Sequence, residues 1–268
     1  MRVLYIGDIM GEFGRWAAAK ELPTIKDEYK PDLILAQAEN VTHGRGLKIE
    51  HYKELRDMGI DGFMSGNHIL ALPETNTLVS DENHPVTRPA NYPEGTPGKR
   101  HKIIKGQGGD VALITLLGQI VGKDADEPTD NPLHVIDELL ELEDVKQAPV
   151  KIVNFHGDYS SEKVVIGQYL DGKVAAVIGD HWHVPSADGR VLPNGTAHIS
   201  DVGMVGARNS SLGVKTDVIV KRWHSQAPSR NELEESGEYQ FCAVLFEVDE
   251  SSGKAVGIEQ ILRFGARE

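Results

Sequence analysis

Short apolar runs alternate along the chain with longer stretches that have helical composition. Six runs predict buried strands: Arg2–Gly7, Asp32–Ala38, Gly62–Ser65, Val111–Leu117, Lys151–Phe155 and Val174–Ile178. Between them, composition and spacing predict helices at Gly14–Glu21, Ile49–Met58, Pro132–Glu143 and Ser161–Leu170, with Pro23 and Gly59 as stop signals. Alternation of this kind predicts a largely parallel sheet with helices on its faces.

The last part of the chain breaks this alternation. After Ala197 the sequence reads as strands and turns, with longer strands predicted at Phe241–Val248 and Val256–Phe264. This pattern indicates an antiparallel addition to the sheet. No linker is long enough to require a second domain, so we expect residues 1–268 to form a single domain.

Composition and charge narrow the class of protein. The chain has 28 basic and 41 acidic residues, and its formal net charge of −13 argues against an extended nucleic-acid-binding face. The only cysteine, Cys242, excludes a disulfide framework within the chain and a cysteine-based metal site. The longest apolar run, Val111–Gly122, is shorter than the roughly 20 residues of a membrane span. The N-terminus reaches Asp8 without a signal-peptide pattern, so we expect a cytoplasmic protein with no membrane partner.

Polar side chains of similar chemistry follow five of the predicted strands. They are Asp8, Glu39-Asn40, Asn67-His68, His156 and His181-Trp182-His183. Taken alone, each has a plainer explanation, because an aspartate after a strand often forms a turn and a histidine there is often a core residue. Together they are expected to converge, since ligands of α/β sheets bind beyond the carboxyl ends of the strands.

The chemistry of these side chains points to a metal site. On an extended segment residues i and i+2 point the same way, so His181 and His183 can reach one centre. Oxygen and imidazole donors without cysteine suit Mn, Fe or Zn, rather than a soft metal or a calcium cage.

The order Gly-Asp, Glu-Asn, Gly-Asn-His, His and Gly-x-His-x-His resembles the metallophosphoesterases, and more closely the YmdB-like bacterial phosphodiesterases. The resemblance runs over nearly the whole chain and rests on long segments such as RVLYIGDIMGEFGR, AENVTHGRGL, MSGNH and RPANYPEGTPGK. Met10 stands where many metallophosphoesterases have a histidine, in agreement with the YmdB-like family, whose first motif lacks that histidine. The resemblance implies an α/β sandwich of two packed sheets flanked by helices.

The same resemblance implies a binuclear centre of two divalent transition-metal ions, Fe or Mn, with Zn as the alternative. The implied ligands are Asp8, Glu39 and His183 for one ion, and Asn67, His156 and His181 for the other, with Glu39 shared. A hydroxide bridging the ions would attack a cyclic nucleotide, 2′,3′-cyclic first and 3′,5′-cyclic second, and His68 would protonate the leaving oxygen. Asn40, His43 and Arg45 are candidate substrate contacts, and Arg88 and Asn91 are weaker ones.

Some positions depart from the family's pattern. Asp180 and Trp182 replace threonines, Gly157-Asp158 replaces Ala-Glu, and Gln37-Ala38 replaces Asn-Gly. We expect these changes to alter the wall of the pocket and the substrate preference rather than the chemistry. Two other functions stay open: a phosphomonoesterase or nucleotidase with the same centre, and a nucleotide-sensing regulator without turnover. The expected partner is a small phosphodiester, and whether identical chains associate is left open.

Overall fold

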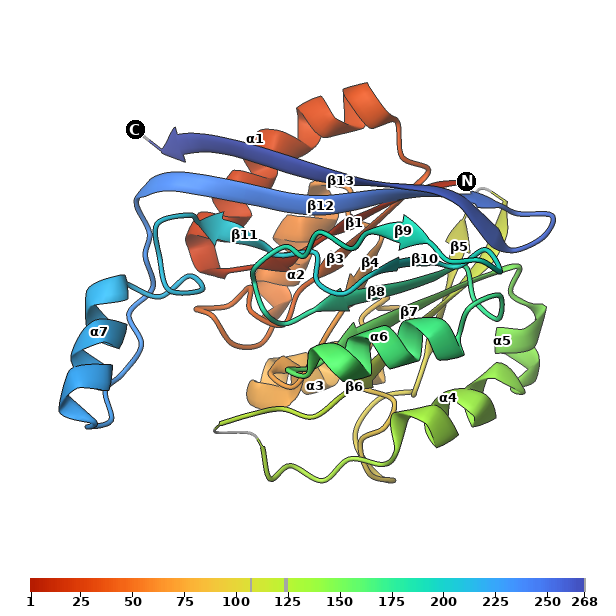
Figure 1. The fold of residues 1–268 in the computed structure, drawn as a ribbon, viewed down its shortest axis with the longest axis horizontal. Coiled ribbons are helices and arrows are strands. Elements are labelled where there is room, and N and C mark those ends of the chain that lie inside the picture. Colours follow the sequence, from red (N-terminus) through yellow and green to blue (C-terminus); the bar gives the residue numbers. More distant parts are fainter. Residues whose placement is uncertain (107, 123–124, 268) are drawn as a thin grey trace.

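Two β-sheets pack face to face in the computed structural model, which describes residues 1–106, 108–122 and 125–267 (Figure 1). The first sheet has the order β2 (Asp8–Ile9), β11 (Met204–Ala207), β12 (Gly237–Asp249), β1 (Arg2–Ile6), β3 (Leu33–Gln37) and β4 (Gly62–Met64), and β13 (Lys254–Arg267) also pairs with β12. The second has the order β5 (Lys102–Gly106), β6 (Gly109–Leu117), β7 (Val150–His156), β8 (Ala176–Asp180), β10 (Ala197–Ile199) and β9 (Arg190–Val191). The predicted α/β sandwich is confirmed.

Both sheets are mixed. In the first, β1, β3 and β4 run parallel, while β12 pairs antiparallel with β1. In the second, β6, β7, β8 and β10 run parallel, and β5 and β9 are antiparallel edges. The expectation of one largely parallel sheet is therefore wrong. Strand–helix alternation indicates parallel neighbours, but it does not say how the strands divide between two sheets.

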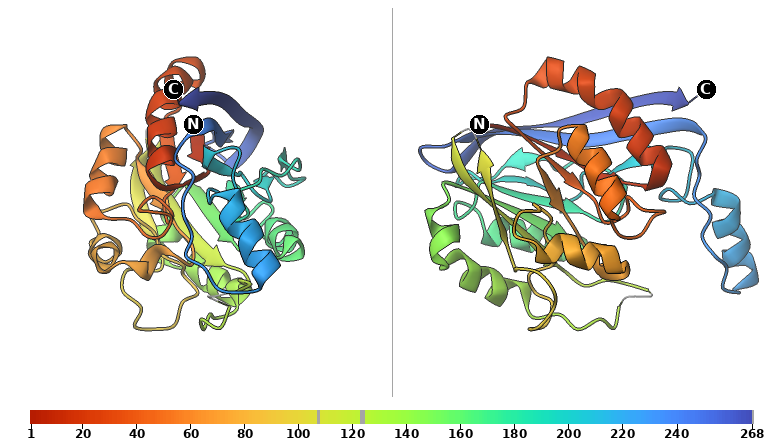
Figure 2. Two further views of the ribbon diagram at one scale, coloured as in Figure 1. Left: turned by 90° about the vertical axis from the view of Figure 1, so that its left-hand side faces the viewer. Right: turned by 180° about the vertical axis from the view of Figure 1, so that it is seen from behind.

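Helices cover the two outer faces of the sandwich (Figure 2). On the first sheet lie α1 (Gly11–Tyr29), α2 (Ile49–Asp57) and α3 (Pro73–Ser80), preceded by the short helix η1 (Ile69–Ala71). On the second lie α4 (Pro132–Leu140), α5 (Glu143–Gln147) and α6 (Ser160–Tyr169). A third apolar cluster fills the space between the sheets and includes Tyr5, Leu35 and Phe246. Among the described residues, no helix is long and apolar enough to cross a membrane.

Several helices differ from the predictions, among them α3 and α5, which the sequence does not predict as separate helices. Pro23 does not end the first helix, because α1 continues to Tyr29. Proline removes one helical hydrogen bond, but Leu22 and Ile25 on either side of it are buried in the core under the sheet. The region predicted as strands and turns also contains α7 (Thr216–Ser225), which has no buried residue and stands away from the sandwich (Figure 1).

Candidate metal centre

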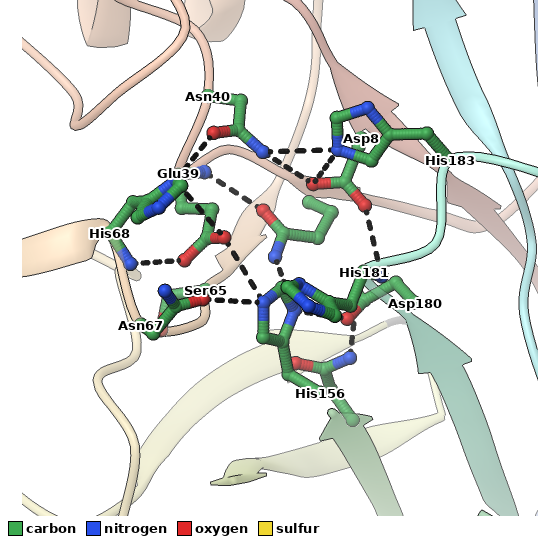
Figure 3. A network of polar contacts seen from close by, with 12 residues as sticks. Asp8, Glu39, Asn40, Ser65, Asn67, His68, His156, Asp180, His181 and His183 are labelled. Atoms are coloured by element: carbon green, nitrogen blue, oxygen red, sulfur yellow. Dashed lines mark hydrogen bonds and ion pairs between the residues drawn. The ribbon is translucent and has the colours of Figure 1, made fainter. Parts of the chain in front are cut away.

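The polar residues that follow the predicted strands meet between the two sheets (Figure 3). The first sheet contributes Asp8 at the start of β2, Glu39 after β3 and Asn67 after β4, and the second contributes His156 at the end of β7 and His181 after β8. The carboxyl ends of β3, β4, β7 and β8 thus lie at the same end of the sandwich. The structure brings together eight of the residues singled out in the sequence: Asp8, Glu39, Asn40, Asn67, His68, His156, His181 and His183.

One part of this cluster surrounds the carboxylate of Glu39. Ligand atoms of Glu39, His156 and His181 all lie within 4.8 Å of one another. His156 Nε2 is 3.1 Å from Glu39 Oε1 and 3.0 Å from Asn67 Oδ1. Glu39 Oε2 accepts the backbone N–H of His68 at 2.8 Å, whereas the buried Oε1 accepts no hydrogen bond within the described part of the chain. A buried carboxylate oxygen without a donor is costly unless a cation faces it.

A second part of the cluster adjoins the first and is built around Asp8. Its Oδ1 lies 3.7 Å from His183 Nε2 and accepts a hydrogen bond from Asn40 Nδ2 at 3.0 Å. Its Oδ2 faces the backbone N–H of His181 at 3.4 Å. His181 therefore joins the two parts, with its side chain in one and its backbone beside the other.

Each of the three imidazoles is also held from outside the cluster. The outer contacts are His156 Nδ1 to Asp180 Oδ1 at 2.7 Å, His181 Nε2 to Asp158 Oδ2 at 3.2 Å, and His183 Nδ1 to the carbonyl of Leu212 at 3.1 Å. Histidines that ligate metals typically place their second ring nitrogen against a carboxylate or a carbonyl, which fixes the ring and its tautomer. The three histidines therefore have the surroundings of metal ligands.

The segment that carries His181 and His183 is bent rather than extended. β8 ends at Asp180, and the φ angles of His181 and His183 are 104° and 62°. The expectation that an extended segment aligns the two side chains is therefore wrong, although both still face the cluster (Figure 3). Positive φ at residues other than glycine costs on the order of 1–3 kcal/mol each, and it concentrates at functional sites.

Burial and neighbouring charges set the protonation of the two carboxylates in the cluster. Burial, reinforced by the carboxylate of Asp180, raises the pKa of Asp8 well above its ordinary value. Burial also acts to raise the pKa of Glu39, but the imidazoles of His156 and His68 outweigh it and lower that pKa to about 2. Glu39 is therefore ionised at neutral pH, and it faces the imidazole of His156.

The three histidines differ in the charge that they carry without a metal. Burial acts to lower the pKa of His156, but the carboxylates of Glu39 and Asp180 outweigh it and raise that pKa well above its ordinary value. Burial lowers the pKa of His181 to about 3, with help from His156, and burial lowers the pKa of His183 to about 4. Neutral imidazoles are the form that binds metals. Carboxylates that stabilise a proton on His156 also stabilise a metal cation beside it, so the group of Glu39, His156 and His181 fits a metal ion.

The predicted proton donor lies over this cluster. His68 Nδ1 is 3.0 Å from Asn40 Oδ1 and 3.8 Å from Glu39 Oε1, and 28% of the side chain is exposed. The amide of Asn40 is engaged on both sides, with Nδ2 donating to Asp8 and Oδ1 facing His68. Because Oδ1 can only accept, His68 Nδ1 carries the hydrogen. These contacts indicate that Asn40 orients the ring of His68. They do not favour the role predicted for Asn40 from the sequence, which was contact with the substrate.

The other predicted substrate contacts lie outside the cluster. His43 is exposed, with a φ of 51°, and Arg45 lines a cavity next to Asn67. The weaker candidates hold a loop: Arg88 donates to the carbonyls of Pro89 and Gly98, and Asn91 both donates to and accepts from the backbone of Leu117.

Two cavities adjoin the cluster at Asn67. One has a volume of about 480 Å³ and is lined by residues 117–122, Glu127 and Tyr159. The other has a volume of about 240 Å³ and is lined by Arg45, Tyr92 and Glu127. Tyr92 donates a hydrogen bond to Glu127 at 3.1 Å, and both Asn67 and Glu127 line the two cavities. The larger cavity has the size of a small-molecule site.

The structure corrects the expectation that Asp180 alters the wall of the pocket, whereas for the partly exposed Trp182 that expectation stays a prediction. Asp180 is fully buried behind His156, where the sequence offers no sign of its partners. Trp182 donates from its indole to the carbonyl of Asp158 at 3.0 Å, and its ring lies 4.4 Å from Lys163 Nζ. Of the partners of Asp180, Asn154 could have been found from the sequence, because it lies two positions before His156 and so shares a face of β7 with it.

Known proteins match the chain over nearly its full length. A family model described as "YmdB-like protein" matches residues 4–261. A Bacillus subtilis protein named 2′,3′-cyclic-nucleotide 2′-phosphodiesterase is 39% identical over 262 residues, which cover 98% of this chain and 97% of that protein. A crystal structure of a hypothetical protein from Thermus thermophilus is 35% identical, with a TM-score of 0.89 over 98% of this chain and 99% of the other. A crystal structure described as a novel phosphatase from Mycoplasma pneumoniae is 30% identical, with a TM-score of 0.91 over 99% of this chain and 94% of the other.

Proposed function

This chain belongs to the YmdB-like family, and from that premise we propose that it is a binuclear metal-dependent phosphodiesterase that hydrolyses 2′,3′-cyclic nucleotides, with 3′,5′-cyclic nucleotides as a second substrate. The observation that carries the proposal is the cluster of three imidazoles, each held from outside, beside the carboxylates of Glu39 and Asp8, with one oxygen of Glu39 that accepts no hydrogen bond from the described residues. The name of the Bacillus subtilis relative supplies the substrate class.

Two groups of side chains would hold the metals. Asp8 and His183 would bind one ion, Asn67, His156 and His181 would bind the other, and Glu39 would bind both. When bound, two such ions supply a water of lowered pKa as the nucleophile and positive charge for the phosphate oxygens. Fe or Mn is the proposed metal, with Zn as the alternative, because the donors are oxygens and imidazoles.

The chain's own residues handle the leaving group. The hydrogen bond to Asn40 Oδ1 occupies the hydrogen on His68 Nδ1, so the proton for the departing ribose oxygen would come from the N–H of Nε2 in the imidazolium form of the ring. His68 is thus oriented for general acid catalysis, which contributes roughly 10²–10⁴-fold to such reactions.

The rest of the substrate occupies the cavities beside the centre. With the phosphate next to Asn67, the nucleoside extends into the cavity of about 480 Å³, where the ring of Tyr159 offers a stacking surface. That side chain is 47% exposed, so it is available to a base. Arg45 lines the smaller cavity and is the proposed phosphate contact, with His43 on the same loop.

A second candidate function is phosphomonoester hydrolysis by the same centre. The description of the Mycoplasma pneumoniae structure as a phosphatase favours it. A regulator without turnover is disfavoured, because a sensor needs neither a full ligand set nor an oriented proton donor such as His68. The cytoplasmic location stays a prediction.

The test uses purified protein reconstituted with Mn²⁺ or Fe²⁺. We expect about two ions per chain by elemental analysis, and faster hydrolysis of 2′,3′-cyclic AMP than of 2′-AMP or 3′-AMP. Faster release of phosphate from the monoesters would favour the phosphatase. No turnover of either class by a fully loaded protein would reject both enzymatic functions.

A further inference from the structure

The carboxylate of Asp180 lies directly behind the imidazole of His156, on the side away from Glu39 (Figure 3). The parallel pairing of β7 and β8 sets the two residues opposite one another. Asp180 Oδ1 lies 2.7 Å from His156 Nδ1, while His156 Nε2 faces Glu39 and Asn67. The imidazole therefore stands between a buried carboxylate and the proposed metal position.

The position of this carboxylate is fixed by buried donors. Its Oδ2 accepts the hydroxyl of Tyr5 at 2.8 Å and the amide of Asn154 at 2.6 Å. The main-chain carbonyl of Asp180 accepts a hydrogen bond from the ammonium of Lys163. Tyr5, Asn154 and Lys163 are at most 1% exposed. With both oxygens engaged, the carboxylate cannot turn away from His156.

We propose that Asp180 is a positioning residue for the ion that Glu39, Asn67, His156 and His181 would hold. A histidine that binds a metal through Nε2 keeps its hydrogen on Nδ1, and Asp180 is placed to accept that hydrogen. The contact fixes the ring with Nε2 toward the ion, and the negative charge makes the imidazole a stronger ligand. Asp180 thereby raises the affinity of this ion. The inference rests on the proposed function only in so far as it assumes that these four residues bind a metal.

The charges around Asp180 support a role toward a cation. The nearest buried ammonium, that of Lys163, is already paired with Asp201 at 3.1 Å and reaches only the carbonyl of Asp180. The threonine expected at this position in the family would supply a hydroxyl but no charge. The carboxylates of Asp8 and Glu39 would face the two ions directly. Those of Asp180 and Asp158 would act on the ions through the imidazoles of His156 and His181.

A purely structural role is the rival explanation, because Tyr5 lies in β1 and its hydrogen bond to Asp180 links the two sheets. Stability without metal and metal affinity separate the two roles. Asp180→Asn keeps the shape and an acceptor for His156 but removes the charge, and Asp180→Thr restores the residue usual in the family. Tyr5→Phe removes one outer donor and leaves the carboxylate. Asp188→Asn is the matched control, because Asp188 is a half-buried carboxylate that accepts from Ser186 and Ser200 away from the cluster.

The experiment compares these proteins after chelation and dialysis. Titration with Mn²⁺ against a competing chelator gives the two dissociation constants, Co²⁺ substitution gives the ligand-field spectrum, and thermal melting gives the stability of each metal-free protein. We expect Asp180→Thr to raise one of the two constants roughly 10–100-fold and to change the Co²⁺ spectrum, as loss of an outer partner of a metal ligand does elsewhere. Asp180→Asn should have a smaller effect and Tyr5→Phe the smallest, while Asp188→Asn should leave both constants unchanged.

Unchanged constants and an unchanged spectrum in Asp180→Asn would overturn the proposal, and so would a loss of metal-free stability with no change in affinity. If Asp180→Thr fails to fold, Asp180→Asn and Tyr5→Phe still decide the question. Failure of the proposed function looks different, because the unsubstituted protein would then bind fewer than two ions or hydrolyse no phosphoester.

Discussion

Replacing His68 by alanine should reduce turnover by an amount that depends on the leaving group. In a 2′,3′-cyclic nucleotide the departing oxygen is a ribose hydroxyl, which leaves poorly unless a proton reaches it. In bis(4-nitrophenyl) phosphate the departing phenol is acidic and needs little help. Loss of general acid catalysis is worth roughly 10²–10⁴-fold, or about 3–5 kcal/mol of barrier. We expect this loss in kcat on the cyclic nucleotide and a loss nearer to tenfold or less on the aryl diester.

The structure predicts that the fold and the metals survive this change. The imidazole of His68 is partly exposed, and its contacts include the hydrogen bond to Asn40 Oδ1 at 3.0 Å and the 3.8 Å approach to Glu39. One such hydrogen bond is worth about 0.5–1.5 kcal/mol, well below the expected catalytic effect. The backbone N–H that Glu39 Oε2 accepts is retained in alanine.

The assay measures kcat for both substrates, together with metal content, on one preparation of each protein. Asn40→Leu serves as a companion variant, because it leaves His68 in place but removes its acceptor and should show the same substrate dependence in weaker form. Equal losses on both substrates with metals retained would refute proton donation and indicate binding of the ground-state phosphate. Loss of one ion from His68→Ala would make this histidine a ligand.

Three further predictions concern the surroundings of the centre. Asp8→Ala and His181→Ala should each abolish turnover and lower metal content while the circular dichroism of the metal-free protein stays unchanged; near-normal activity in either would contradict the ligand set. Lys163→Met should lower the free energy of unfolding in urea by about 3–5 kcal/mol, because it leaves the buried carboxylate of Asp201 without its cation. The double variant Lys163→Met with Asp201→Asn should recover much of that loss. Additive effects of the two substitutions on stability would argue against the pairing. Tyr159→Ala should raise KM for cyclic nucleotides in line with a lost base stack of about 1–3 kcal/mol, with kcat little changed, and an unchanged KM would place the nucleoside elsewhere.

The sequence predicts where the proposed ligands lie better than it predicts what lies behind them. Asp8, Glu39 and His156 follow apolar strands, and the rule that α/β sheets expose function at strand ends applies whichever sheet a strand joins. The partners of Asp180 depend on packing instead. Tyr5 is one apolar position among several in β1, and it reaches Asp180 only because the two sheets face each other.

The predictions for the end of the first helix and for the segment with His181 and His183 failed for the same reason, because tertiary packing decided the local conformation. Pro23 is a valid stop signal in isolation, but the core contacts of Leu22 and Ile25 carry α1 past it. The bend at His181 and His183 was not predicted, because positive φ is uncommon outside glycine and depends here on the tertiary surroundings, which include the hydrogen bond from the backbone N–H of Trp182 to Asp201 at 2.8 Å.

The placement of β12 has a consequence for how the protein is made. β1 lies between β3 and β12, with Tyr5 opposite Val244, and β2 pairs with β11, with Asp8 opposite Met204. On the ribosome, the early strands of the first sheet therefore keep an open edge until the late strands have emerged. The proposed ligands Asp8 and Glu39 are synthesised early, but the strands that close the sheet around them come near the end. Metal loading is thus expected to follow completion of the chain, and nascent chains halted before β11 should not retain the ions.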